Sequence, residues 1–252
     1  MSRMKFLNIE VDNFTMNEAL ESIEKLILDK CSSYVVTPNV DHIVKIETDD
    51  EFKLIYNDAD LILTDGMPLI WISKFFNTPI KEKVSGSDLF PKVCEMASKR
   101  GYSIFLLGAA EGVGEIAALN LKNKYKNIEI KGTLSPSYGF ENNESEIKNI
   151  IKIIKDANPD ILAVGLGAPK QEKFIYKYKD ELNVPVSLAI GASIDFEAGN
   201  ITRAPKFMQK VGLEWFYRLI KEPRRMFKRY MIDDMKIIPI IFRYLKNSKM
   251  EN

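Results

Sequence analysis

Five polar segments of this 252-residue chain combine glycine with side chains that can bind or react with a ligand. Each follows a short apolar run, and together they cover residues 37–42, 64–68, 108–114, 165–172 and 191–199. Asp65 stands between an apolar run and Gly66, a position suited to a general base that takes a proton from a reacting group. An Asp-Gly pair is also typical of an ordinary turn, so the placement of the other segments has to decide between these interpretations.

The glycine-rich segment 108–114 precedes a stretch with helical periodicity. Exposed amide groups and the helix dipole at such a position favour phosphate, so Gly108 is a candidate contact for a phosphate or ribose. The spacing is not that of the G-x-G-x-x-G dinucleotide motif, and no Walker lysine motif is present. Close packing of the backbone is the alternative role for these glycines.

Metal-ligand patterns in the chain are weak. Asp58 and Asp60 form an Asp-x-Asp pair, but they precede an apolar run instead of following one, which indicates a solvated loop. Cys31 and Cys94 lie far apart, and a lone histidine, His42, is more often structural than catalytic. We therefore expect neither a disulfide nor a required metal, and no cofactor.

Apolar runs alternate with longer amphipathic stretches along the chain. The expected strands are 5–11, 34–37, 61–64, 103–107, 128–133, 161–165 and 186–190. The clearest expected helices are 16–28, with Asn13 or Thr15 as its cap, 112–125, 144–154 and 171–182. Strands separated by such helices pair in parallel through right-handed crossovers. The sequence predicts an α/β fold: a Rossmann-like, mainly parallel sheet with helices on both faces.

In such sheets the ligand lies at the carboxyl ends of the strands. Four of the polar segments follow predicted strands directly and should therefore meet at one edge. Their convergence favours the catalytic interpretation of Asp65 over the turn.

The carboxyl end differs from the rest of the chain. We expect residues 1–199 to form the Rossmann-like catalytic core and residues 200–252 a basic, aromatic, helical appendage. Its positive and aromatic residues include Arg203, Lys206, Lys210, Trp215, Phe216, Tyr217, Arg218, Lys221, Arg224, Phe227 and Arg229. Phe207, Val211, Trp215 and Leu219 recur every four residues, a spacing that could instead bury one helix face.

Side chains that combine an apolar part with a basic or polar end group are suited to the membrane interface, where they contact anionic lipid headgroups. Nucleic-acid binding is not expected, because the net charge is only +1 and no recognition motif accompanies the basic segment. No secretory signal is visible, and the apolar block 237–242 is interrupted by Pro239. We expect a cytoplasmic protein, peripheral on the inner face of the cell membrane, and self-association as another way to cover apolar surface.

Several motifs in one order resemble those of the WecG/TagA/CpsF family, glycosyltransferase family 26. The matching segments are 37–39, 64–68, 86–89, 105–108, 165–173 and 191–230. The resemblance implies transfer of a sugar from a UDP-sugar to a polyprenyl-diphosphate-linked sugar. Within its wall-teichoic-acid branch, the donor sugar is N-acetylmannosamine and the acceptor is undecaprenyl-diphosphate-linked N-acetylglucosamine. Capsule or exopolysaccharide assembly with another UDP-sugar is the alternative within the same family.

The resemblance also implies roles for individual residues. Asp65 becomes the catalytic base, and the basic appendage closes over the diphosphates with Arg218, Arg225 and Lys228. The expected substrate contacts are Thr37, Asn39, Lys83, Gly108, Gln171 and Asp195. Lys83 occupies a position where arginine is expected, and lysine lacks the planar double contact that arginine makes with phosphate.

The expected reaction is a single displacement with inversion, in which Asp65 deprotonates the acceptor hydroxyl. An ordinary aspartate, with a pKa of about 3.9, is already ionised at neutral pH and needs positioning more than tuning. Two other classes of protein share some of these features. They are a nicotinamide-dependent oxidoreductase, suggested by the fold and the Gly108 segment, and a non-catalytic membrane-binding module.

A thermal-shift measurement separates these classes. A ligand that binds only the folded state raises its melting temperature, so UDP should stabilise the protein and NAD should not. Stabilisation by NAD alone would favour the oxidoreductase. Liposome binding without any effect of UDP would favour the membrane module.

Overall fold

A six-stranded parallel sheet forms the centre of the fold in the computed structural model, which describes residues 3–248 without the side chains of Lys210, Arg225, Asn247 and Ser248. In spatial order the strands are β4 (Leu61–Ile62), β3 (Ser33–Val36), β8 (Val186–Ala189), β7 (Ile161–Gly165), β5 (Ser103–Gly108) and β6 (Glu129–Leu134). All neighbours pair in parallel, with one register shift between β5 and β6.

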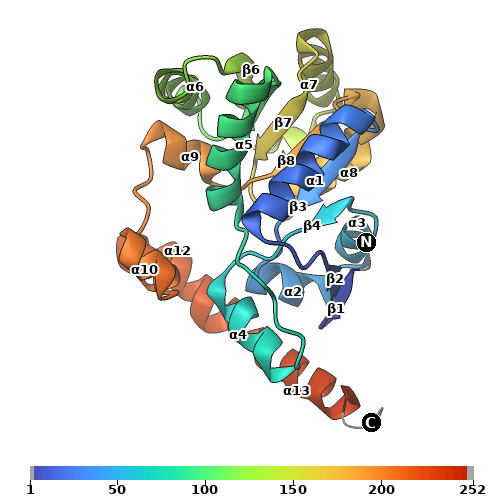
Figure 1. Ribbon diagram of the computed structural model, residues 1–252, viewed down its shortest axis with the longest axis vertical. Coiled ribbons are helices and arrows are strands. Elements are labelled where there is room, and N and C mark those ends of the chain that lie inside the picture. The colour runs from blue at the N-terminus through green and yellow to red at the C-terminus, as the bar shows by residue number, and fades with distance from the viewer. Residues whose placement is uncertain (1–2, 249–252) are drawn as a thin grey trace.

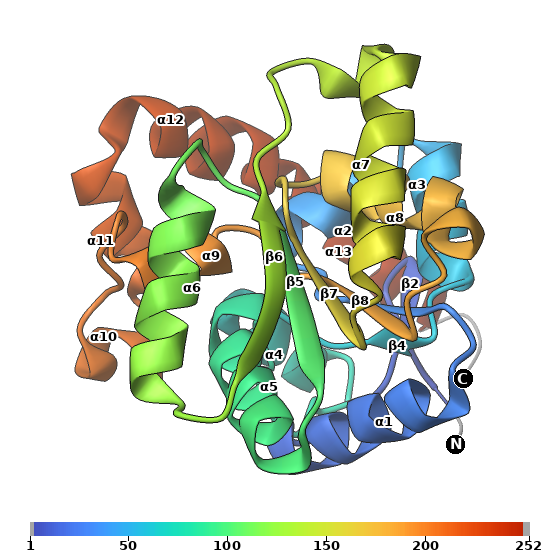
Figure 2. The same ribbon diagram turned by 90° about the horizontal axis from the view of Figure 1, so that it is seen from above.

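Helices cover both faces of this sheet (Figure 2). One face carries α1 (Met16–Asp29), α5 (Gly86–Arg100), α6 (Val113–Lys124) and α9 (Ser193–Ala198). The other carries α2 (Val40–Ile46), α3 (Asp50–Asn57), α7 (Glu144–Ala157) and α8 (Lys170–Leu182). The predicted Rossmann-like α/β fold is confirmed, and α2, α3, α5 and α9 add helices to the four ranges expected.

The strands bury both of their faces. Along β5, Ile104 and Leu106 pack with the α1 and α5 side, whereas Phe105 and Leu107 pack with the α7 and α8 side. Successive side chains of a strand point to opposite faces, so one apolar run supplies two separate hydrophobic cores. This explains why the strands read as continuous apolar runs in the sequence.

The expected strand 5–11 is instead a hairpin. β1 (Met4–Phe6) and β2 (Ile9–Val11) pair antiparallel and form their own two-stranded sheet. Leu7 adopts a φ of 51°, and the Asn8 side chain donates a hydrogen bond to the Ile43 carbonyl at 2.8 Å. The alternation of apolar residues continues through the two-residue turn without a glycine, so the turn left no signal in the sequence.

Helix α1 begins as expected. Thr15 accepts a hydrogen bond from the Glu18 backbone N–H, and Glu18 accepts one from the Thr15 N–H. This reciprocal capping satisfies two amides that the first turn leaves without a helical partner.

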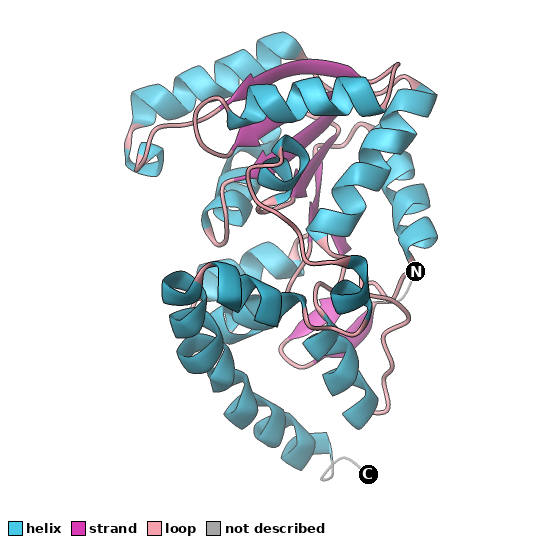
Figure 3. Ribbon diagram, turned by 90° about the vertical axis from the view of Figure 1, so that its left-hand side faces the viewer, coloured by secondary structure: helices cyan, strands magenta, loops and turns pink. Residues whose placement is uncertain are grey.

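The part of the chain that follows α9 is helical and extends from one end of the sheet-containing part (Figures 1 and 3). Its elements are α10 (Lys206–Lys210), α11 (Glu214–Lys221), α12 (Pro223–Lys228), a π-turn (Arg229–Asp233), a 3-10 turn (Asp234–Lys236) and α13 (Ile237–Ser248). The expected boundary at residue 199 falls in the loop between α9 and α10. No helix within residues 3–248 is both long and apolar enough to cross a bilayer.

The four-residue periodicity of Phe207 and Val211 does not bury a helix face. Gly212, with a φ of 77°, separates α10 from α11, and Phe207 and Val211 are 66% and 56% exposed. Met226 of α12 and Ile237 of α13 are buried and hold this segment on the core.

Candidate active site

Two cavities lie where the carboxyl ends of β3, β4, β7 and β8 meet the C-terminal helices. The larger has a volume of about 710 Å³. Its lining includes Thr37, Asn39, His42, Asp65, Ser87, Gln171, Gly191, Ser193, Phe196, Arg218 and Arg229. The smaller has a volume of about 420 Å³ and is mainly apolar.

The two cavities share a border. Asn39, Asp65, Arg218 and Arg229 line both of them. Asn39 and Asp65 come from the strand ends, and the two arginines come from α11 and the π-turn. A ligand in one cavity can therefore touch a ligand in the other beside a carboxylate and two guanidinium groups.

Asp65 is fixed by the strand that precedes it. The Leu63 N–H donates to the Val36 carbonyl at 2.9 Å, and the Asp65 N–H donates to the Pro38 carbonyl at 2.8 Å. Gly66 then turns the chain away with a φ of 96°, which side-chain-bearing residues rarely adopt. Within the described residues no donor lies within hydrogen-bonding distance of the Asp65 carboxylate, which leaves its oxygens available to a ligand.

Burial raises the pKa of the Asp65 carboxyl above its ordinary value. Lys83 opposes this rise in pKa and Glu214 adds to it. The expectation that Asp65 has the pKa of an ordinary aspartate is therefore wrong. A carboxylate that is removed from water is a stronger base than an exposed one. The sequence could not show this, because the groups that desolvate Asp65 come from distant segments.

Three of the expected substrate contacts lie in the larger cavity. Thr37 follows β3, and its hydroxyl donates to the Ala189 carbonyl at 3.4 Å. Asn39 precedes α2 and accepts a hydrogen bond from the Arg229 guanidinium at 3.4 Å. Gln171 lies in the first turn of α8 and lines the same cavity.

Gln171 belongs to a buried polar cluster. Its side chain accepts from the Gly191 N–H at 3.1 Å and donates to Glu172 at 2.8 Å. The Glu172 carboxylate lies 3.5 Å from Nε2 of His42, whose Nδ1 accepts from the Asn39 N–H at 3.1 Å. This cluster connects two cavity-lining amides. His42 was interpreted from the sequence as structural, and Glu172 was not among the expected site residues.

The cationic side of the site differs partly from the expectation. Arg218 lines both cavities, and its guanidinium lies 5.5 Å from the Phe196 ring. Lys228 is exposed at the end of α12 and lines neither cavity, whereas Arg229, one residue on, lines both. A rotation of about 100° per helical residue separates the two side chains. The side chain of Arg225 lies outside the described residues.

Gly108 and Asp195 are not among the residues that line the cavities. A Cβ on Gly108 would lie 2.5 Å from the Gly165 carbonyl oxygen, so this glycine permits close packing of β5 on β7. The Asp195 carboxylate accepts from the Asn200 side chain at 3.1 Å and closes the end of α9. Close packing is the alternative role that the sequence left open for Gly108, and contact of Gly108 or Asp195 with a substrate stays a prediction.

The smaller cavity is walled by aromatic and sulfur-containing side chains. These are Met67 and Trp71 of α4 (Met67–Phe75), Trp215, Tyr230, Met231 and Met235. A Cβ on Gly212 would lie 2.8 Å from the Trp71 ring, so the turn before α11 can press on α4 only because it is glycine. Lys83 and Glu214 add a charged rim.

The Asp-x-Asp pair serves the fold. Asp58 accepts from the Tyr176 hydroxyl at 2.9 Å, and Asp60 accepts from the Tyr34 N–H at 2.9 Å. Both residues lie in the loop between α3 and β4, as expected. Among residues 3–248 no group of three or more His, Cys, Asp and Glu side chains is arranged to hold a metal ion.

Comparisons with known proteins add an independent line of information. The family model described as "Glycosyl transferase WecG/TagA/CpsF family" matches residues 4–251. A Bacillus subtilis protein, N-acetylglucosaminyldiphosphoundecaprenol N-acetyl-beta-D-mannosaminyltransferase, is 32% identical over 96% of this chain and 92% of its own length. A Staphylococcus aureus protein of the same name is 28% identical over 98% of this chain and 94% of its own length.

The role of Gly108 can be tested by stability and binding together. Gly108→Ala should lower the free energy of unfolding by at least about 2 kcal/mol, because strain at φ 119° adds to the clash with Gly165. Gly101→Ala is the matched control, since its φ is 78° with no atom within 4 Å of the added Cβ. Urea unfolding measures both variants. Loss of UDP affinity at unchanged stability would show instead that Gly108 contacts the ligand.

Proposed function

Because the chain belongs to the WecG/TagA/CpsF family of glycosyl transferases, we propose that it transfers N-acetylmannosamine from UDP to undecaprenyl-diphosphate-linked N-acetylglucosamine. The reaction contributes to wall teichoic acid synthesis. Family membership favours a transferase over the oxidoreductase and the membrane module. The observation that carries the proposal is the meeting of two cavities at Asp65.

The larger cavity suits a nucleotide-sugar. Its volume of about 710 Å³ lies in the range of sites that enclose small ligands. Arg218 and Arg229 stand at its border, and guanidinium groups bind phosphate oxygens through paired hydrogen bonds. Thr37, Asn39 and Gln171 bring polar groups to the strand ends, where we place the sugar and its acetamido group.

The smaller cavity suits a lipid-linked acceptor. Trp71, Trp215 and Tyr230 offer apolar surface, and the same two arginines face this side. An acceptor with its diphosphate at the arginines would extend its prenyl chain along the apolar wall. Its sugar hydroxyl would then lie at Asp65, opposite the donor.

The geometry supports a single displacement with inversion. The acceptor oxygen attacks the anomeric carbon as Asp65 takes its proton, and the bond from that carbon to the diphosphate of UDP breaks. Negative charge develops on the leaving diphosphate. Arg218 and Arg229 neutralise this charge from fixed positions at the border of the two cavities, which stabilises the transition state electrostatically. The proposal therefore needs no divalent metal and no cofactor.

We also propose that residues 200–252 bind the inner face of the cell membrane from the cytoplasm. On α11, Phe216 and Ile220 are 43% and 62% exposed and lie four residues apart, on one side of the helix. Exposed Phe227 and Phe242 add apolar surface to the neighbouring α12 and α13. With the basic residues of this segment, they match the chemistry of an anionic lipid interface.

Replacement of the proposed base tests the mechanism. Asp65→Asn keeps the size of the side chain and removes its basicity, so kcat should fall by about 100-fold to 10,000-fold, while UDP binding stays near wild type. Transfer to a short-chain polyprenyl-diphosphate N-acetylglucosamine, read by mass spectrometry, measures the loss. Full activity of Asp65→Asn with this acceptor would remove Asp65 as the base.

The pH profile tests the same residue in the wild-type protein. A carboxylate acts as a base only when ionised, so kcat/KM is lost as the pH falls through its pKa. Because burial raises the pKa of Asp65, this loss should begin at a higher pH than for an exposed aspartate. An acid limb at the ordinary aspartate value would contradict the desolvated base.

Lipid binding is tested with a double substitution on α11. Phe216→Ser with Ile220→Ser should weaken binding to phosphatidylglycerol vesicles by tenfold or more, because about 1.5 to 3 kcal/mol per buried side chain is lost. Ile116→Ser with Leu119→Ser is the matched control, since both residues are similarly exposed on α6. Equal losses in the two double variants, or a concentration-dependent mass without lipid binding, would contradict the membrane proposal. Vesicle sedimentation and light scattering supply these readings.

A further inference from the structure

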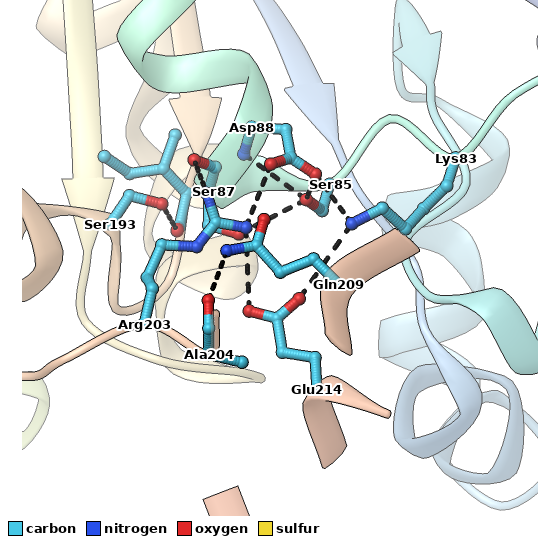
Figure 4. Close-up of polar contacts among 10 residues, drawn as sticks. Lys83, Ser85, Ser87, Asp88, Ser193, Arg203, Ala204, Gln209 and Glu214 are labelled. Carbon is cyan, nitrogen blue, oxygen red and sulfur yellow. Dashed lines mark hydrogen bonds and ion pairs between the residues drawn. The ribbon is translucent and has the colours of Figure 1, made fainter. Parts of the chain in front are cut away.

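Four side chains of alternating charge join the core to the C-terminal segment beside the site (Figure 4). Asp88 lies 2.6 Å from Lys83 through one oxygen and 2.9 Å from Arg203 through the other. Glu214 lies 3.6 Å from Arg203 and 4.0 Å from Lys83. Lys83, Asp88, Arg203 and Glu214 therefore form a closed ring, called the charge ring below.

The charge ring is protected from solvent. Its four side chains are between 15% and 27% exposed, so salt and water screen them less than a surface ion pair. Asp88 is also held by the Ser85 hydroxyl, which donates to it at 2.7 Å and caps α5. Arg203 donates a further hydrogen bond to the Ser87 carbonyl at 3.1 Å.

Two members of the charge ring belong to the core, and the other two belong to the chain that follows α9. Lys83 and Asp88 belong to the core, because they flank the start of α5. Arg203 follows α9 in the loop that leads to the C-terminal segment, and Glu214 is the first residue of α11. Formation of the ring therefore decides where α11 lies on the core.

The position of Glu214 on α11 affects where Arg218 of the same helix lies in the site. Arg218 is four residues after Glu214, so both side chains lie on one side of the helix. The guanidinium groups of Arg203 and Arg218 lie 5.6 Å and 5.5 Å from the centre of the Phe196 ring. A displaced Glu214 would thus withdraw Arg218 from both cavities.

The charge ring also affects the pKa of Asp65. Lys83 and Glu214 share the smaller cavity with Asp65, and Asp88 holds the Lys83 ammonium on the opposite side. Lys83 lowers the pKa of Asp65, whereas Glu214 and Asp88 raise it. The charged or titratable groups around Asp65 include Lys83, Asp88 of α5, Glu214 and Arg218 of α11, His42 of α2, Tyr56 of α3, Arg229 and Tyr230 of the π-turn, and Asp234.

We infer that Asp88 and Glu214 are positioning residues of the transferase, which seat Arg218 over the diphosphates and hold Lys83 beside the base. The inference rests on the proposed function. Neither carboxylate takes part in proton transfer. Each acts through a cation that lines the smaller cavity with Asp65, which distinguishes them from ordinary surface ion pairs.

Neutral substitutions of similar shape test the inference. Asp88→Asn and Glu214→Gln should each lower kcat/KM and UDP affinity by about tenfold or more, as expected for a shielded ion pair that holds a ligand-binding group. Glu95→Gln is the matched control. Glu95 lies on the same helix as Asp88, pairs with Lys92 and Lys99 at the surface, and lines neither cavity.

The acid limb of the pH profile gives a reading that loss of stability alone would not move. Removal of either carboxylate removes negative charge near Asp65 and frees Lys83, so the pKa of Asp65 should fall and the acid limb should shift to lower pH. Asp88→Asn combined with Arg203→Gln should lose about the same factor in kcat/KM as either change alone, because both break one ring. Thermal unfolding confirms that each variant is folded.

The outcomes separate this inference from the proposed function. An inactive wild-type protein with UDP-N-acetylmannosamine and the short-chain acceptor would overturn the proposed function itself. With an active wild type, the inference fails if the ring variants match Glu95→Gln. It also fails if the ring variants lose activity with no shift of the acid limb.

Discussion

Parallel pairing forces the ends of β3, β4, β7 and β8 to one edge of the sheet, and the site depends on this constraint. Neighbouring strands that run in one direction deliver their following loops to the same place. Thr37, Asp65 and Gly191 thus meet although more than 120 residues separate the first from the last.

A second constraint is electrostatic. The edge of the sheet offers amides, hydroxyls and the Asp65 carboxylate, but the substrates of the proposed reaction carry diphosphates. The positive charge comes from the C-terminal segment through Arg218 and Arg229. Burial raises the pKa of Asp65 most, and Glu214 of the same segment raises it further. The C-terminal segment therefore contributes both to the leaving group and to the base.

Much of the fold and part of the site could be predicted from the sequence, for identifiable reasons. Buried strands and amphipathic helices have strong local periodicities, and Asp65 follows such a strand directly. The hairpin at Leu7 gave no turn signal, and the sequence could not decide between ligand contact and close packing for Gly108, which packs against Gly165 of the neighbouring strand. Lys228 was expected from the family resemblance, whereas only the three-dimensional helix shows that Arg229 is the side chain that lines the cavities. These features depend on contacts between residues far apart in the sequence, which local patterns do not show.

The origin of Arg218 and Arg229 so late in the chain has a consequence for protein synthesis. The last strand of the sheet ends at Ala189, so the ribosome completes the strand edge before it makes either arginine. A nascent chain that has not reached Arg218 would hold the Asp65 carboxylate without either of the arginines that line both cavities.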